Sequence, residues 1–439
     1  MRKKYWIILY ALIAVLLLSG CSLYTVSELY CLPVRSEQYT NLQSVMNSAM
    51  SGMEYSAPVS GDNQQTVQSV DLDGDGVSEY LLFAKDSSDK PLKIFVFSGD
   101  GSHYSLLDTI ESPGTSFDRV EYIKMDDAPG YEVVIGRKIS DQVVRSMSVY
   151  TLHGGQMEQI MSANYTEFVC SDLDDDHKSD ILVMHPGDGS SGVAVVYSIS
   201  NGALVRSQEV TMSEPADNIM RIMSGKLDDG VAAVYVASSV SGSSGIITDI
   251  FAIKNGNLTN ISLSSESGTS VQTLRNYYVY ADDIDGDGIL ELPSLITMKQ
   301  TQDSYDASSQ YIICWYAMTS DGKKVPKRYT YHNYLGGWYV ELDGSIAERF
   351  TVTQKGSSYE FSLWDETMTT AEKLMTVYAL TGQRREEQAV AENRFILHRG
   401  DATIYSADLE MASAAYGMSK DSLIASFYLI LEDWKTGET

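Results

Sequence analysis

The sequence predicts a mainly β protein: a β-propeller of about five blades, with six or seven as alternatives, followed by a small α+β domain. A nine-residue acidic block occurs three times along the 439-residue chain, and two weaker copies lie between the three. Each copy is followed by short apolar runs of strand length. One such sheet cannot bury both faces alone, whereas neighbouring sheets stacked around an axis can. An array of β-sandwiches is the competing arrangement.

The three acidic blocks carry carboxylates at positions 1, 3, 5 and 9. They read DLDGDGVSE at Asp71–Glu79, DLDDDHKSD at Asp172–Asp180 and DIDGDGILE at Asp283–Glu291. Calcium takes six to eight oxygen ligands, and glycines at positions 4 and 6 let the backbone turn sharply around an ion. Crowded carboxylates repel one another, and the two outer blocks contain no Lys or Arg, so a cation is the natural counter-charge. In the middle block His177 replaces the second glycine.

We therefore expect two or three structural Ca²⁺ sites. The expected ligands are the carboxylates of positions 1, 3, 5 and 9 and, in the outer blocks, the backbone carbonyl of position 7. They are Asp71, Asp73, Asp75, Val77 and Glu79; Asp172, Asp174, Asp176 and Asp180; and Asp283, Asp285, Asp287, Ile289 and Glu291. The alternative is a set of ordinary β-turns, since Asp and Gly both favour turns.

An EF-hand opens with the same acidic pattern, but the sequence around the blocks excludes it. That motif needs a Glu at loop position 12 and a helix on each side. Position 12 is Leu82, Val183 or Ser294, within apolar runs of β type. The blocks are therefore expected to join strands.

The repeat has a regular spacing. We take the third residue of each copy as an anchor, which gives Asp73, Asp126, Asp174, Asp228 and Asp285. These anchors are 53, 48, 54 and 57 residues apart, within the range of propeller blades. A glycine in an expected hairpin turn follows the first four anchors by 28 residues and the fifth by 37. Lys124 and Lys226 replace the first acidic position in the second and fourth units, so those loops are expected to fold without metal.

The blocks resemble the VCBS and FG-GAP repeats of integrin-α-like β-propellers, in which a D-x-D-G-D-G loop between two strands holds calcium. The resemblance covers about 60% of the chain and implies calcium bound by the block residues named above. The Phe-Gly and Gly-Ala-Pro segments of that family are missing. Five units are recognisable where integrins have seven, so a further unit could lie in residues 331–380.

The first 20 residues have the features of a lipoprotein signal peptide. A basic start (RKK) precedes an apolar stretch from Tyr5 to Leu18, which is too short for a permanent membrane span. The LSGC string that ends at Cys21 resembles the bacterial lipobox. This resemblance implies lipidation of Cys21 and attachment to the extracytoplasmic face of a bacterial cell membrane. An ordinary signal peptide is the alternative.

Composition and spacing divide the rest of the chain. Residues 21–61 are expected to form a lipidated tether and a short helix, because apolar residues lie at helical spacing from Tyr39 to Met50. Residues 62–330 form the propeller repeats, and residues 331–439 form the α+β domain. A final helix in that domain is expected to begin at the cap Ser419, with an apolar face that includes Leu423, Phe427 and Trp434.

Charge and motifs restrict the function. The net charge of −27 argues against a nucleic-acid partner. No nucleophile elbow, H-E-x-x-H, Walker or dinucleotide-binding motif is present, so no catalytic or organic-cofactor residue is assigned and the chain is expected not to be an enzyme. We expect a surface for a protein or glycan ligand, with calcium in a structural role. A glycan-degrading enzyme on the same scaffold and an envelope assembly subunit are the alternatives.

Overall fold

The structure, a computed structural model, describes residues 37–100, 103–140, 145–200, 202–276, 279–300 and 311–430. The expected signal peptide, the expected lipidation site Cys21 and the expected tether up to residue 36 lie outside these residues. Within the described ranges, no helix has both the length and the apolar character needed to cross a membrane.

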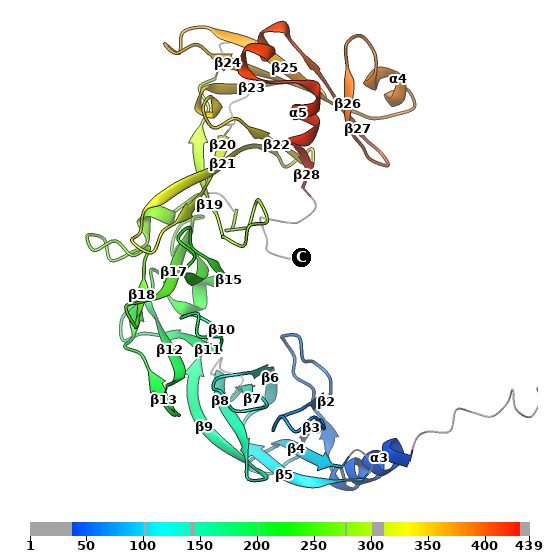
Figure 1. The fold of residues 1–439 in the computed structure, drawn as a ribbon, viewed down its shortest axis with the longest axis vertical. Coiled ribbons are helices and arrows are strands. Elements are labelled where there is room, and N and C mark those ends of the chain that lie inside the picture. Colours follow the sequence, from blue (N-terminus) through cyan, green and yellow to red (C-terminus); the bar gives the residue numbers. More distant parts are fainter. Residues whose placement is uncertain are drawn as a thin grey trace, which may run out of the picture.

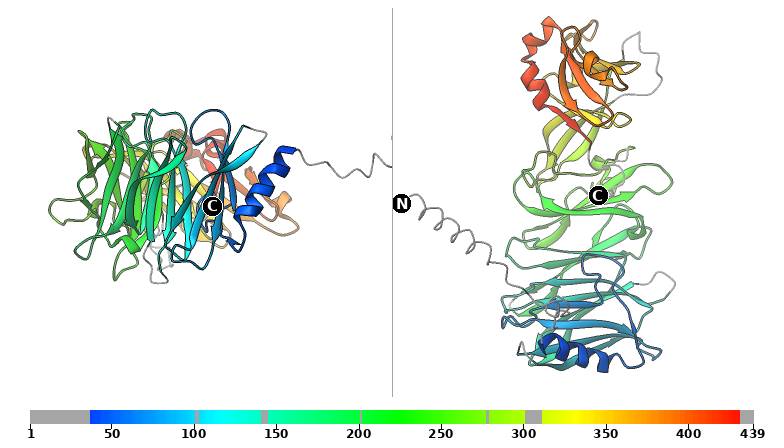
Figure 2. Two further views of the ribbon diagram at one scale, coloured as in Figure 1. Left: turned by 90° about the horizontal axis from the view of Figure 1, so that it is seen from below. Right: turned by 90° about the vertical axis from the view of Figure 1, so that its right-hand side faces the viewer.

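The described chain is mainly β and folds into six antiparallel sheets, numbered here from 1 to 6 in chain order. The sheets follow one another along a curved, open arc, with sheets 1 and 6 at opposite ends (Figure 1). The view from below in Figure 2 shows the first sheets stacked face to face. The mainly β prediction is confirmed. No sheet closes on itself in the described part of the chain, and a closed propeller with a definite blade count stays a prediction.

Sheets 1 to 4 are built around meanders of successive strands, to which the first strand of sheet 1 and the last strand of sheet 3 add out of sequence order. Sheet 1 contains β1 (Glu54–Tyr55), β2 (Val67–Val70), β3 (Glu79–Lys85), β4 (Leu92–Gly99) and β5 (Tyr104–Ser112). Sheet 2 contains β6 (Ser116–Ile123), β7 (Glu132–Lys138), β8 (Arg145–His153) and β9 (Gln156–Tyr165). Sheet 3 contains β10 (Glu167–Ser171), β11 (Asp180–Pro186), β12 (Gly192–Ser200), β13 (Ala203–Arg206) and β14 (Val210–Thr211). Sheet 4 contains β15 (Ile219–Lys226), β16 (Ala232–Ser239), β17 (Ile246–Lys254) and β18 (Asn257–Asn260).

Sheets 5 and 6 hold the rest of the strands. Sheet 5 contains β19 (Leu292–Thr297), β20 (Tyr311–Met318), β21 (Lys324–Asn333), β22 (Trp338–Leu342) and β28 (Phe427–Leu429). Sheet 6 contains β23 (Phe350–Lys355), β24 (Ser358–Trp364), β25 (Ala371–Leu380), β27 (Ile404–Leu409) and β26 (Phe395–Arg399). The helices are α3 (Glu37–Ala49), α4 (Arg385–Ala389), α5 (Lys420–Ala425), η1 (Ala216–Asn218), η2 (Val271–Thr273), η3 (Ala347–Arg349) and η4 (Met411–Tyr416).

The central strands of the first sheets show why the chain stacks. In β3, the four consecutive residues 81–84 are fully buried, so both faces of the strand are covered. Such uninterrupted apolar runs are typical of strands that have a neighbour on each face. The hairpin glycines expected at 154, 202, 256 and 322 lie between the third and fourth strands of sheets 2 to 4 and between β20 and β21. Those four turns are confirmed, and Gly101 lies outside the described residues.

The expected N-terminal helix is confirmed as α3. It covers the outer face of sheet 1 through Leu42 and Met46, which pack on Leu82 and Phe97. Figure 2 shows α3 at the end of the stack. Because sheet 1 has no preceding sheet in the described chain, this helix buries the face that would otherwise be exposed.

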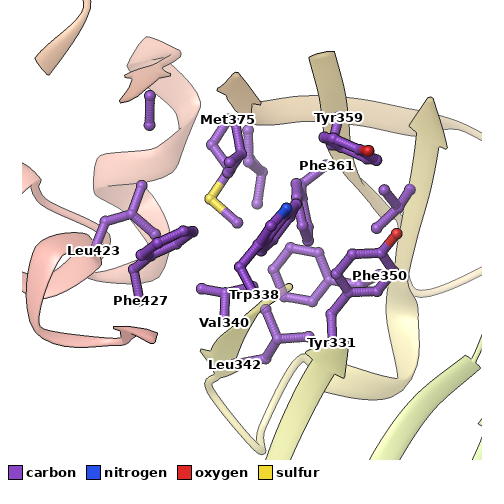
Figure 3. Close-up of a cluster of buried hydrophobic side chains, with 14 of the residues drawn as sticks. Tyr331, Trp338, Val340, Leu342, Phe350, Tyr359, Phe361, Met375, Leu423 and Phe427 are labelled. Atoms are coloured by element: carbon purple, nitrogen blue, oxygen red, sulfur yellow. The ribbon is translucent and has the colours of Figure 1, made fainter. Parts of the chain in front are cut away.

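The largest core lies between sheets 5 and 6. Trp338 is fully buried, and its ring stacks on Phe427 with centroids 5.5 Å apart (Figure 3). The expected domain boundary at residue 330 falls inside β21, and the interval expected to form an α+β domain contributes sheet 6. Residues 331–380, where the sequence leaves room for a further unit, supply its first three strands.

The prediction of a long C-terminal helix is wrong. Ser419 caps α5 as expected, with a reciprocal pair of hydrogen bonds to Ser422, but the helix ends at Ala425. Phe427 belongs to β28, which pairs with β22. The edge of β22 offers unpaired backbone groups beside an apolar core, and pairing there satisfies them while it buries the Phe427 ring. Trp434 lies outside the described residues.

Candidate metal centre

Each acidic block forms the turn that leads into the second strand of a repeat. The first block connects β2 with β3, and the second connects β10 with β11. The third leads into β19, and a backbone bridge between Asp282 and Glu291 takes the place of the first strand pair. Strands therefore follow all three blocks, and the exclusion of an EF-hand is confirmed.

The three turns share one backbone conformation. Positions 4 and 6 have positive φ in the outer blocks, at Gly74 (73°), Gly76 (89°), Gly286 (77°) and Gly288 (82°). In the middle block Asp175 and His177 adopt the same conformation, with φ of 63° and 67°. Residues other than glycine adopt it at a cost of about 1 kcal/mol each. The middle block therefore keeps the turn despite the lost glycines, at the expense of strain.

Three of the four predicted acidic positions converge. Carboxylate oxygens of positions 1, 3 and 9 lie within 4.8 Å of one another in every block. The sets are Asp71, Asp73 and Glu79; Asp172, Asp174 and Asp180; and Asp283, Asp285 and Glu291. In the middle block Asp172 also forms a group with Asp175 and His177.

The carboxylate of position 5 does not join these groups. The carboxylate of Asp75 accepts a hydrogen bond from the backbone N–H of Val77 at 2.7 Å. Asp287 accepts in the same way from Ile289 at 2.8 Å, and Asp176 accepts from Lys178 at 2.9 Å. These carboxylates cap the turn, and a role as metal ligands for positions 5 and 7 stays a prediction.

The position-9 acid is the buried member of each group. Glu79, Asp180 and Glu291 are at most 4% exposed. Each accepts a hydrogen bond from the backbone N–H of position 2, for example Leu72 to Glu79 at 2.9 Å. The turn is thereby tied to the start of the next strand.

Burial, followed by the like charges of neighbouring aspartates, raises the pKa of these acids. The pKa of Asp180 and of Glu291 rises to about 7, and the pKa of Glu79 is also raised. The second oxygen of Glu291, Oε1, is buried and makes no hydrogen bond. A buried acceptor without a donor beside two further carboxylates fits a hard divalent cation, which would supply the missing positive charge.

One member of this series was missed by sequence reasoning. Glu132 occupies position 9 of the second unit, is 5% exposed and accepts from the backbone N–H of Met125 at 2.8 Å. Burial, followed by the negative charge of a neighbouring aspartate, raises its pKa, and the positive charge of Lys124 offsets only part of this. The sequence does contain a sign of this role, because Glu132 follows Lys124 by eight residues, the same spacing that separates positions 1 and 9 of the acidic blocks. The fourth unit has no such acid, and Leu227 N–H donates instead to the carbonyl of Val231 at 2.8 Å.

Basic residues lie beside two of the blocks. Lys178 Nζ is 3.2 Å from Asp127 of the neighbouring loop and 3.6 Å from Asp176. Arg328 Nε is 3.3 Å from Asp285, and its Nη1 is 2.7 Å from Glu341. The contact with Arg328 could not be predicted from the sequence of the third block, because Arg328 lies in β21, which is distant in the sequence and belongs to the same sheet.

The loops of adjacent sheets contact one another through their backbones. Tyr131 N–H donates to the carbonyl of Leu72 at 3.2 Å, which joins sheets 1 and 2. Leu290 N–H donates to the carbonyl of Lys226 at 3.1 Å, which joins sheets 4 and 5. The acidic turns therefore lie where one sheet meets the next, and a bound ion would stiffen that joint.

No family model matches the chain, and a search of curated proteins found no match. Among solved structures, a protein from Lactobacillus plantarum is similar at 14% identity over 72% of this chain and 85% of that one, with a TM-score of 0.27. A rhamnogalacturonan lyase from Bacillus licheniformis is similar at 10% identity, with 73% and 90% covered and a TM-score of 0.29. Sqt1 from Chaetomium thermophilum, solved with the N-terminus of a ribosomal protein, is similar at 10% identity over 75% of this chain and 92% of that one, with a TM-score of 0.30. TM-scores of this size carry no functional argument.

Proposed function

We propose that this chain is a lipid-anchored, extracytoplasmic calcium-binding protein of the propeller type that presents a surface to a protein or glycan ligand. The observation that carries the metal part is the convergence of carboxylates from positions 1, 3 and 9 in three equivalent turns. The sequence features of residues 1–21 support the anchor, and the acidic composition of the chain suits an exported protein without a nucleic-acid partner.

Calcium would act as a structural ion. Positions 1, 3 and 9 would supply oxygens from three side chains, and water or further oxygens of the turn would complete the shell. The ion would remove the repulsion among three carboxylates and, in the third block, would coordinate the buried Oε1 of Glu291, which makes no hydrogen bond. A ligand that binds only the folded state stabilises it by about 2.7 kcal/mol at a hundredfold excess over Kd.

The experiment is a calorimetric calcium titration of residues 22–439 after chelation. We expect two or three ions per chain for the wild type. Asp285→Asn, at position 3 of the third block, should remove about one ion. Asp126→Asn, at position 3 of the second unit where Lys124 replaces the first acid, is the matched control and should leave the stoichiometry unchanged. A wild-type protein that takes up no calcium would refute the proposal.

A further inference from the structure

A polar cavity of about 350 Å³ lies at the ends of the strands opposite the acidic turns of sheets 1 to 3. It is lined by residues of sheets 2 and 3 and by the segment Val59–Gly61. We infer that this cavity is a binding site for a hydroxylated organic acid, such as one uronic acid unit of a glycan. Its volume is near the lower end for small-molecule sites, which suits one or two sugar units.

The cavity wall is fixed by buried interactions. Asp118 is 5% exposed and accepts a hydrogen bond from the Tyr165 hydroxyl at 2.6 Å. Its backbone carbonyl accepts from Val59 N–H at 3.0 Å and from Ser60 N–H at 2.9 Å. Because β6, β9 and the segment before β2 meet at this one residue, the wall is held before any ligand arrives.

A second set of contacts fixes the positive side chains. Arg145 Nη1 donates to Glu167 at 2.9 Å and to the carbonyl of Thr166 at 3.0 Å. Its Nε lies 3.7 Å from Asp118. The Arg119 guanidinium lies 3.8 Å above the ring of Phe168, which belongs to sheet 3. Both arginines therefore connect sheet 2 with sheet 3 and have little freedom to move.

Several polar atoms of the lining residues have no partner within the described ranges. Lys138, at the end of β7, is half-buried and its ammonium makes no hydrogen bond or ion pair there. Arg145 Nη2 donates no hydrogen bond, and Asp118 Oδ1 and Glu167 Oε2 accept none. The site thus retains both donors and acceptors. Arg119 and Arg145 are each paired with a glutamate, at 3.4 Å and 2.9 Å, so Lys138 is the cation of the lining that has no direct acidic partner among the described residues.

The charges and the hydrogen-bond donors and acceptors of the cavity determine which class of ligand it can bind. A phosphate or other compact polyanion would be repelled by Asp118 and Glu167. A neutral sugar would leave Lys138 without a counter-charge. A peptide would find little apolar surface, since Val59 is the one aliphatic side chain in the lining. Hydroxyl groups can pair with the free donors and acceptors, and a single carboxylate can pair with the ammonium.

The inference rests on the ligand-binding part of the proposed function and is independent of its metal part, because the cavity shares no residue with the acidic turns. Calorimetric titrations in the presence of a chelator therefore separate the two. The probes are D-glucuronate, D-glucose, inorganic phosphate and triglutamate. Calcium binding of the same protein is measured separately, so that failure of one proposal leaves the other standing.

We expect D-glucuronate to bind wild-type protein at least about tenfold more tightly than the other three probes. Lys138→Met should weaken D-glucuronate binding roughly ten- to hundredfold, because it removes a charge-assisted hydrogen bond. Lys90→Met is the matched control, since Lys90 is exposed and equally without an acidic partner. It should change nothing, and unchanged melting temperatures should show that both variants fold.

Three results would overturn the inference. One is the absence of D-glucuronate binding by the wild type, and another is equal affinity for D-glucuronate and D-glucose. The third is a Lys138→Met variant that binds D-glucuronate as the wild type does. Tighter binding of triglutamate than of D-glucuronate would assign the cavity to acidic peptides and would equally count against a sugar acid.

Discussion

Replacement of Glu291 by Gln should have opposite effects on stability with and without calcium. The side chain is fully buried, accepts from Ile284 N–H at 3.1 Å and lies in the group with Asp283 and Asp285. Glutamine keeps the acceptor and cannot ionise. Its amide donors would lie within reach of the two aspartates, so the third block would lose one negative charge at little steric cost.

The magnitude follows from the pKa of Glu291, which burial and then the nearby aspartates raise from 4.5 to about 7. The folded state therefore binds this proton more tightly than the unfolded state does. That stabilisation is complete below pH 4.5 and is lost as the pH rises through 7. One pKa unit is worth about 1.4 kcal/mol, and after allowance for solvent screening we expect Glu291→Gln to stabilise chelated protein at pH 8 by about 1–2 kcal/mol.

In the presence of calcium the wild type should be more stable than Glu291→Gln. At a hundredfold excess over Kd the wild type gains about 2.7 kcal/mol from the third site, whereas the variant gains nothing there. Urea denaturation at pH 8, followed by tryptophan fluorescence, reports the free energy of unfolding, and Trp315 in β20 lies in the sheet that the third block leads into. Glu132→Gln is the control, because its unit lacks the converging set, and its effect should not depend on calcium. If Glu291→Gln changed stability with the same sign in both buffers, the electrostatic account of the block would be wrong.

Three further predictions concern the same structure. Gly286→Ala should lower the free energy of unfolding by about 1 kcal/mol from its positive φ alone, since an added Cβ meets nothing within 4 Å. Gly74→Ala should lower it by about 1–3 kcal/mol more, because its Cβ would lie 2.4 Å from Pro129. Equal losses in urea denaturation would contradict the contact between the two loops. His177→Gly should raise the melting temperature, with a gain of about 0.5–1 kcal/mol from relieved strain, and a lower melting temperature would contradict this. Phe427→Ala should lower the free energy of unfolding by about 3–5 kcal/mol and should expose the backbone of β22 to hydrogen exchange. Continued protection of β22 would show that its backbone does not need the pairing with β28.

The repeat architecture could be predicted because its signals are local. The acidic turn and the apolar run that follows it lie within about 15 residues, and the strand after the first turn, β3, contains four consecutive buried residues. Glycines at turn positions mark the hairpins for the same reason, since positive φ selects them wherever the chain bends. These features repeat in register, so each unit supports the interpretation of the others.

Apart from Glu132, whose signal was local, the features that sequence reasoning missed depend on distant partners. Phe427 lies at helical spacing from Leu423, but pairing with Val340 and stacking on Trp338 decide its conformation. Arg328 reaches Asp285 from a strand that begins 39 residues later. Tertiary contacts of this kind override local periodicity, and a single sequence contains no sign of them.

The four position-9 acids separate the role of the turn from the role of the metal. Glu132 ties its turn to the next strand in a unit where Lys124 replaces the first aspartate, so the tie does not depend on an acid at position 1. In the other three units aspartates occupy positions 1 and 3 beside an equally buried acid, and neighbouring aspartates disfavour its ionisation. The position-1 aspartates also accept backbone N–H hydrogen bonds within each turn, from Gly74 and Gly76 in the first block for example, so these residues have a role in the turn without any ion. Support for a divalent cation therefore comes from the like charges at positions 3 and 9, and the comparison of Glu291→Gln with and without calcium tests it.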